Sequence, residues 1–436
     1  MITVELAETP SFCAHEHWGS IDSIGMTPEG FRADVVPGAT PLRRTGLMDI
    51  LLDPYFGGSL GMAGVNVNSL ASDSGFANFR EMALSEPVRA MSALRPALKV
   101  QRMTGTYQCI RRGVMRLYGI DIDVEGDDGI AELDSRIGNK YSAPFAWYRE
   151  AMIEARMNGL IRPVHPEFYF ADTSSAEASS ELGFTNTVMR IDPLLGMWPT
   201  DCPRREKLAA RLGVEPRDAA SWRRLLEKLF DKAAKSGSLG IKQLQAYSRS
   251  LDFRARTDAQ VAWKGPSDPD QVRAFQDWIV HECCRLAHDR GWPHQIHVGT
   301  HNLSHSSPLP LSTLAEKYPN MKIVQLHCWP FLREAGWLAR QHRNVFIDTC
   351  WLPVLNPRYY RNAVEEWINY VPLHKIMCAH DSTSVEMAAG SLVFVREILA
   401  EILSTQSTAT GMGERLLEQT AAMFLNGNAN EVYLVH

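Results

Sequence analysis

The stretch SFCAHEH, residues 11–17, carries two histidines one residue apart at the end of an apolar run. In a β-strand, residues two apart point to the same face, whereas on a helix His15 and His17 would diverge by roughly 200°. If the run is a strand, both imidazoles can converge on one object. The pair therefore predicts half of a metal site where a first strand ends.

Seven further short apolar runs, often rich in β-branched residues, follow this stretch. They are GLIRPVH (159–165), TNTVMRID (185–192), LGIKQLQAY (239–247), HQIHVG (294–299), KIVQLHC (322–328), NVFIDTC (344–350) and KIMCAHDS (375–382). Several are continuous rather than alternating, which is typical of strands buried on both faces of a parallel sheet.

Amphipathic helical patterns lie between these runs. The segments 218–237 and 268–291 both open on an aspartate suited to an N-cap and stop at a glycine. Strand and helix alternating eight times predict an α/β fold, and they favour a (β/α)₈ TIM-like barrel over a doubly wound open sheet.

The segment from about 18 to 158 does not fit this alternation. It begins rich in glycine and proline and continues as helical patterns. We expect it to be a mainly helical insertion after the first strand, within a single domain over residues 1–436. Such an insertion leaves the barrel at the carboxyl end of a strand, where barrel active sites lie, so it is placed to cap the site.

Composition excludes several classes of protein. Hydrophobic residues make up 45% and charged residues 22% of the 436 residues, as in ordinary soluble globular proteins. The formal net charge of −5 gives no basic footprint, so we expect no nucleic-acid partner. No run approaches the roughly 18 apolar residues of a membrane span, and the first residues lack a signal-peptide pattern, so we expect a cytoplasmic protein without a membrane partner.

The eight cysteines are scattered along the chain without CxxC pairs. This spacing argues against a disulfide framework and against a zinc site built from cysteines alone. We expect most of them to be buried, reduced thiols.

Three later runs also end on side chains that can bind metal. His297, His327 and Asp381 each stand where a strand gives way to a loop. If all are carboxyl-terminal positions of one barrel, they converge with the opening histidine pair. Imidazole nitrogen and carboxylate oxygen are ligands of a catalytic zinc or similar ion, which lowers the pKa of bound water from about 15.7 to around 7. The pattern predicts a metal-dependent enzyme acting on a small molecule.

Other polar side chains near strand ends are candidates for substrate binding. Arg190 could recognise a substrate anion with its bidentate guanidinium, or it could form an internal ion pair with Asp192. Tyr247 and Arg249, which lie past Lys242, have the same two interpretations.

Two loop residues and one strand residue complete the candidates. His301 could touch substrate or be a solvated loop residue, and Trp329 could form an aromatic wall or pack under a loop. His380 precedes Asp381 directly, so in a strand it faces the other way and is expected to be structural.

The order of these residues resembles the amidohydrolase superfamily of metal-dependent (β/α)₈ enzymes. Its members carry HxH after the first strand, single histidines after two later strands and an aspartate after the last. The chain is most similar to the amidohydrolase 2 type, and within it to the domain fused to glutamine-synthetase-like proteins of fungi and plants. Further local matches are residues 106–121, 239–253 and 421–435, so the resemblance covers nearly the whole chain, although only the histidines and the aspartate are diagnostic.

The resemblance implies roles for these residues. His15, His17 and His297 would bind the metal, and Asp381 would bind it too or act as the proton-transferring base. His327 would bind a second metal or polarise the reacting oxygen of the substrate.

The resemblance leaves metal number and assembly open. Lys242 matches a position where some branches carry a carboxylated lysine that bridges two metals, while in other branches it could pair with a substrate carboxylate. We therefore expect one or two divalent ions, zinc first and Mn²⁺ or Fe²⁺ as alternatives. Many relatives form homo-oligomers, but no isolated interface signal stands out in this sequence.

The reaction expected from the resemblance is hydrolysis of an amide or another C–N bond. Asp381 would accept a proton from metal-activated water and deliver it to the leaving group. A decarboxylase, a lactonase or a uronate-isomerase-like enzyme could use the same ligands. A non-catalytic metal-binding scaffold is the alternative from another class.

Overall fold

Eight parallel strands form the centre of the molecule. The computed structural model describes residues 4–19, 46–66, 76, 78–123, 126–171, 180–197, 202–265 and 268–435. The strands pair in sequence order and are β1 (Ser11–Cys13), β2 (Met157–Val164), β3 (Thr185–Arg190), β4 (Ser238–Gln243), β5 (Pro293–Val298), β6 (Lys322–His327), β7 (Val345–Asp348) and β8 (Ile376–Met377).

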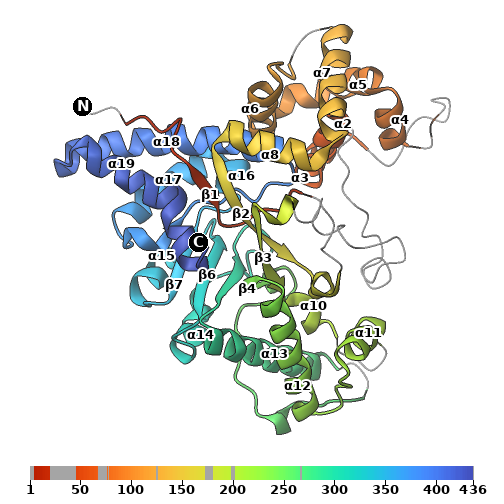
Figure 1. Cartoon of the computed structure of the whole chain (residues 1–436), viewed down its shortest axis with the longest axis vertical. Helices are drawn as coiled ribbons and strands as arrows, with labels where there is room; N and C mark the ends of the chain where they lie inside the picture. The colour runs from red at the N-terminus through yellow and green to blue at the C-terminus, as the bar shows by residue number, and fades with distance from the viewer. Residues whose placement is uncertain are drawn as a thin grey trace.

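Backbone hydrogen bonds beyond β1 bring the two edges of this sheet together. Ala14 N–H donates to the carbonyl of Cys378 (2.9 Å), and His17 N–H donates to that of Ser382 (3.0 Å). Between them, Glu16 N–H turns the other way, to the carbonyl of β2 residue Ile161 (2.9 Å). The sheet thus curls on itself at the centre of Figure 1, and the predicted (β/α)₈ fold is confirmed.

The strands form because their apolar residues are buried on both faces. All six residues of β5 are buried, and so are five of the six residues of β6. Such continuous burial is what helices outside a parallel barrel produce. It explains why these runs read as unbroken apolar stretches.

Helices follow the strands along the outside of the barrel. They are α10 (Asp192–Leu195), α11 (Pro203–Leu212), α12 (Ala219–Lys235), α13 (Pro269–Arg290), α14 (Ser312–Lys317), α15 (Leu332–Gln341), α16 (Leu352–Leu355), α17 (Pro357–Ile368) and α18 (Val385–Thr410). Asp218 caps α12 through Ser221 N–H (2.8 Å), and α13 begins after Asp268 and ends before Gly291. Both predicted helices are confirmed.

The described part of the segment between β1 and β2 is helical. It comprises α2 (Leu47–Leu51), α3 (Pro54–Met62), α4 (Phe79–Ser85), α5 (Pro87–Gln101), α6 (Gly105–Tyr118), α7 (Asp127–Tyr141) and α8 (Pro144–Ala155), most of them grouped at the top right of Figure 1. Helix α6 packs closely on α18 at two glycines, since a Cβ on Gly113 would lie 1.7 Å from the carbonyl oxygen of Glu386, and one on Gly390 would lie 1.8 Å from that of Cys109. This contact fixes the insertion to the barrel.

The end of the chain packs against the barrel through α19 (Glu414–Ala422), a π-helical turn (Met423–Gly427) and α20 (Asn428–Tyr433). The Asn428 side chain donates to the carbonyls of Leu373 (2.8 Å) and Ile376 (2.7 Å), beside the start of β8. Within the part of the chain that the structure describes, no helix is long and apolar enough to cross a membrane. All eight cysteines are free thiols, and seven are buried.

Candidate metal centre

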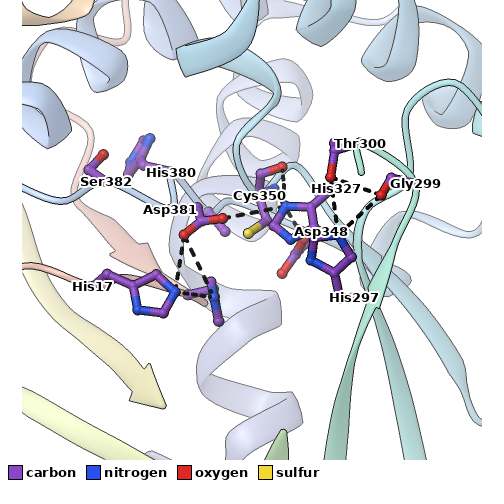
Figure 2. Close-up of polar contacts among 12 residues, drawn as sticks. His17, His297, Gly299, Thr300, His327, Asp348, Cys350, His380, Asp381 and Ser382 are labelled. Carbon is purple, nitrogen blue, oxygen red and sulfur yellow. Dashed lines mark hydrogen bonds and ion pairs between the residues drawn. The ribbon is translucent and has the colours of Figure 1, made fainter. Parts of the chain in front are cut away.

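Asp381 stands at the centre of a cluster of histidines at the carboxyl end of the barrel. Its Oδ1 lies 3.3 Å from Nε2 of His17 and 3.8 Å from Nε2 of His15. Its Oδ2 lies 3.5 Å from Nδ1 of His327. Figure 2 shows His17 and His327 on opposite sides of this carboxylate. Residues from the two ends of the chain therefore meet at one point.

A buried chain of hydrogen bonds orients the ring of His15. The Gln295 amide nitrogen donates to the Ala14 carbonyl (2.8 Å) and contacts the Tyr433 hydroxyl (2.7 Å), so its oxygen faces Nδ1 of His15 at 2.8 Å. Nδ1 must then carry the proton, and Nε2 presents its lone pair. A histidine held through its second nitrogen in this way is typical of metal ligands.

The spacing of the facing atoms fits a metal ion. The Nε2 atoms of His15 and His17 lie 3.2 Å apart. Two nitrogens bound to one tetrahedral zinc at about 2.0–2.1 Å lie about 3.4 Å apart. The chemistry of the donors also fits, since imidazole and carboxylate suit zinc and related divalent ions. His15, His17 and Asp381 could therefore hold such an ion.

Burial keeps these histidines neutral. Loss of hydration is the main cause that lowers the pKa of His15, His17, His297 and His327 well below the usual value. The positive charge of Lys242 lowers the pKa of all four further. Neutral imidazole is the form that binds a metal.

The same burial raises the pKa of Asp381 to about 6, although Lys242 and a hydrogen bond from Tyr55 act in the opposite direction. The carboxyl group thus titrates close to neutral pH, as suits a group that accepts and returns a proton.

His297 and His327 lie side by side, with ring centroids 4.3 Å apart. Nε2 of His297 faces the Gly299 carbonyl (3.1 Å), and Nδ1 of His327 faces the Cys350 carbonyl (3.3 Å). Because carbonyls only accept, these nitrogens carry the protons and the other nitrogen of each ring is an acceptor. The structure places His297 beyond His327, away from Asp381 (Figure 2), and its metal ligation stays a prediction.

The backbone is strained where the strands end. Thr300, His327, Cys328, Trp351 and Asp381 have φ between 56° and 67°, in the left-handed region that non-glycine residues rarely adopt. Such residues cost on the order of 1–3 kcal/mol each and cluster at functional sites. Their position after β5 to β8 is independent evidence for a site at this end of the barrel.

Two cationic residues lie on neighbouring strands at the same end. Arg190 on β3 and Lys242 on β4 are register partners. The Arg190 guanidinium makes two hydrogen bonds to Asp192 (2.7 and 3.2 Å), as the ion-pair alternative predicted. Lys242 is only 3% exposed, and its ammonium has no hydrogen-bond partner among the described residues. Burial and the charge of Arg190 lower its pKa to about 8.

Aromatic rings lie beside the histidines. Tyr247 packs on His297 (4.5 Å between centroids) and on His301 (4.6 Å), and His301 stacks on Trp351 (5.1 Å). Trp351 in turn contacts His327 (5.6 Å). Tyr247 and His301 are thus brought to the cluster, although their contact with substrate stays a prediction.

Two other predicted substrate-binding residues have different surroundings. Arg249 is buried and pairs with Asp277 on α13 (2.6 Å), and it also donates to the Asp252 carbonyl (3.0 Å). Trp329 stacks on Tyr359 (4.5 Å between centroids). In the described part of the chain, the side chains of Arg249 and Trp329 make no hydrogen bond or ring contact with the histidine cluster, although Trp329 N–H donates to the His327 carbonyl (2.9 Å). Their roles in substrate binding stay predictions.

His380 packs away from the cluster, as predicted. Its Nδ1 lies 2.9 Å from the Ser391 hydroxyl on α18, and Figure 2 shows its ring directed away from Asp381. Alternation along the chain thus separates a structural histidine from the neighbouring carboxylate.

Sequence reasoning missed three residues at this site. The Tyr55 hydroxyl, from α3 of the insertion, donates to Asp381 Oδ1 (3.0 Å). Cys350 and Asp348 lie at the end of β7, and Oδ2 of Asp348 has no hydrogen-bond partner within the described residues. The run NVFIDTC (344–350) ends at a strand terminus, as the histidine runs do. Asp348 and Cys350 could therefore have been predicted as site residues from their position in the sequence. No comparable signal marks Tyr55.

Comparison with known proteins supports the predicted resemblance. Residues 252–434 match the amidohydrolase family model. The protein fluG of Emericella nidulans is 29% identical over 179 residues, which is 35% of this chain and 20% of that protein. The match thus spans a fifth of the length of that relative.

Solved structures share the fold over almost the entire chain. Glucuronate isomerase from Caulobacter crescentus is 15% identical with a TM-score of 0.73, covering 98% of this chain and 92% of that one. A candidate metal-dependent hydrolase from Lactobacillus casei is also 15% identical, with a TM-score of 0.62 and coverage of 99% and 98%. With the barrel, the strand-end residues and the matching family model together, the resemblance of this chain to the amidohydrolases is confirmed.

Proposed function

We propose that the protein is a metal-dependent hydrolase that cleaves an amide or another C–N bond of a small, anionic molecule. One observation carries this proposal. Nε2 of His15, Nε2 of His17 and Oδ1 of Asp381 lie within 3.2 to 3.8 Å of one another, the spacing of ligands around one divalent ion. Zinc is our first choice, with Mn²⁺ and Fe²⁺ as alternatives.

His15, His17 and Asp381 would hold the ion, with His297 as a further predicted ligand. A bound divalent ion supplies a nucleophilic water at neutral pH and polarises the bond under attack. The side chain of His17 is 29% exposed, whereas His15 is fully buried. Substrate would therefore approach from the side of His17.

Asp381 would accept a proton from the attacking water and return it to the leaving nitrogen. Without an ion, burial raises the pKa of this carboxyl group to about 6, and the charge of a bound ion would favour the ionised form that accepts a proton. The hydrogen bond from Tyr55 to Oδ1 restricts rotation of the carboxyl group. Asp381 is thus held in place for transfer in both directions.

Lys242 would recognise an anionic group of the substrate. It is buried, has no hydrogen-bond partner among the described residues, and lies close enough for its charge to act on His15, His17, His327 and Asp381. A substrate carboxylate would satisfy the ammonium group. Carboxylation of Lys242 is the competing interpretation from the amidohydrolase resemblance.

Isomerisation of a sugar acid is the second candidate function. It is favoured by the same buried lysine beside the donor cluster, and the structure of glucuronate isomerase shares the fold over 98% of this chain. In this reaction Asp381 or a neighbouring histidine would move a proton between adjacent carbons. The decarboxylase and lactonase alternatives gain no separate support.

A product screen tests the proposal. Zinc-loaded protein is incubated with N-acyl amino acids and with uronic acids, and released amine and newly formed keto sugar are measured separately. We expect amine release that is lost in Asp381→Asn. Formation of the keto sugar would favour the second candidate, and metal-loaded protein without turnover on either panel would favour the scaffold alternative.

A further inference from the structure

Cys350 places a sulfur atom inside the proposed metal centre. Its Sγ, a ring nitrogen of His15 and a carboxylate oxygen of Asp381 all lie within 4.8 Å of one another. All three side chains are buried. Figure 2 shows the sulfur beside the Asp381 carboxylate and next to His327.

The backbone after β7 directs the thiol to this position. Cys350 N–H donates to Oδ1 of Asp348 (3.0 Å), and the Cys350 carbonyl faces Nδ1 of His327 (3.3 Å). The next residue, Trp351, has a φ of 63°. Cys350 is therefore held from both sides, at the strained turn where β7 ends.

Other buried cysteines of the chain have ordinary local partners. Cys109 donates to the Pro353 carbonyl (3.6 Å), Cys328 to the Gln325 carbonyl (3.5 Å), and Cys284 lies 3.6 Å from His294. Cys350 differs because its Sγ lies within 4.8 Å of both a ring nitrogen of His15 and a carboxylate oxygen of Asp381. Within the described residues, no other cysteine shares a three-donor cluster of this kind.

The spacing suits a sulfur ligand. Zinc binds cysteine sulfur at about 2.3 Å and histidine nitrogen at about 2.0–2.1 Å, so two such ligands of a tetrahedral ion lie about 3.6 Å apart. Side-chain shifts of about 1 Å would bring donors that lie within 4.8 Å of one another to this spacing. Sulfur is a soft donor that favours zinc over manganese and magnesium, which prefer oxygen.

We infer that Cys350 supplies a sulfur ligand to the divalent ion and biases the centre toward zinc. This inference rests on the proposed function, because it requires an ion between His15 and Asp381. Binding of the ion releases the thiol proton to solvent. Cys350 would then hold the ion together with His15 and Asp381, the two residues that share its donor cluster.

X-ray absorption at the zinc edge of zinc-loaded wild-type protein tests the inference without any substitution. We expect one sulfur neighbour at about 2.3 Å together with nitrogen and oxygen neighbours at about 2.0–2.1 Å. Bound zinc with only nitrogen and oxygen neighbours would overturn the inference and leave the proposed hydrolase intact. Failure of the wild-type protein to retain any metal would overturn the proposed function instead.

Variants then assign the sulfur. In Cys350→Ser we expect loss of the sulfur neighbour and a fall of about tenfold or more in the preference for zinc over manganese, measured by competition for the two ions. Cys284→Ser is the matched control, because it changes an equally buried thiol on α13 and should keep the sulfur neighbour. A sulfur neighbour that persists in Cys350→Ser would contradict the inference.

Discussion

The β1 and β6–β8 side of the barrel mouth differs from its β3–β4 side in the chemistry of the side chains presented. The first side holds neutral imidazoles, a thiol and the carboxyl group of Asp381, all of which can bind a metal ion. The second side holds Lys242, which cannot bind a metal in its charged form but can bind an anion, and Arg190, which is paired with Asp192. The difference teaches how one site can activate a bond on one side and hold the charge of its substrate on the other.

Removing the carboxylate from the first side should have the largest effect. Asp381→Asn takes away the proposed proton carrier, and we expect kcat to fall by about 10³-fold on any amide that the wild type cleaves. Circular dichroism should show an unchanged fold. If turnover of Asp381→Asn stays within tenfold of wild type, Asp381 is not the proton carrier and the first side does not supply this catalytic step.

The pH dependence of stability should expose the same carboxyl group. Burial raises the pKa of Asp381 from 3.8 to about 6 in the metal-free fold, so the folded state holds a proton that the unfolded state has already lost. Its contribution to stability is complete below pH 3.8 and is lost as the pH rises through 6, by at most about 3 kcal/mol.

Denaturant unfolding of metal-free protein between pH 4 and 7.5 measures this effect. The free energy of unfolding of wild type should fall relative to that of Asp381→Asn as the pH rises. If the difference in unfolding free energy between wild type and Asp381→Asn stays constant over this pH range, burial does not raise the pKa of the Asp381 carboxyl group.

The second side is tested by Lys242→Met, which removes the charge and keeps much of the side-chain volume. We expect kcat/KM for an anionic substrate to fall by about 10²-fold, mainly through KM, because one charge-assisted hydrogen bond is lost. Metal content should stay as in wild type. Loss of a metal ion together with activity would instead support a carboxylated lysine that bridges two ions.

Tyr55→Phe should have the smallest effect. It tests whether a residue of the helical insertion positions Asp381 on the first side. Only the hydroxyl that donates to Asp381 is removed, so we expect kcat to fall by about tenfold, the value of one hydrogen bond. Tyr359→Phe, on the ring that stacks on Trp329, is the control. Equal effects of the two substitutions would argue against a role for Tyr55 in positioning.

The barrel could be predicted because its strands are buried on both faces and therefore appear as unbroken apolar runs. The meeting of His15, His17 and Asp381 followed from the same argument, since parallel strands end at one edge. Because neighbouring residues of a strand point to opposite faces, the sequence also predicted that the His380 side chain points away from Asp381 and its site. These features depend on local periodicity, which a single sequence records.

Features that depend on tertiary contacts could not be predicted. Arg249 pairs with Asp277, a helix residue that lies near it only after α13 packs on the barrel. Tyr55 reaches Asp381 because α6 crosses α18 through paired glycines and fixes the insertion. Arg249 and Asp277 are 28 positions apart and Tyr55 and Asp381 are 326 positions apart, and no sequence pattern links either pair.

The central claim is that one divalent ion binds where the two ends of the chain meet. A crystal of zinc-loaded protein measured on both sides of the zinc absorption edge tests this directly. The account predicts an anomalous peak within about 2–2.3 Å of His15 Nε2, His17 Nε2 and an oxygen of Asp381. A fully occupied zinc elsewhere, with no peak between these three residues, would contradict it.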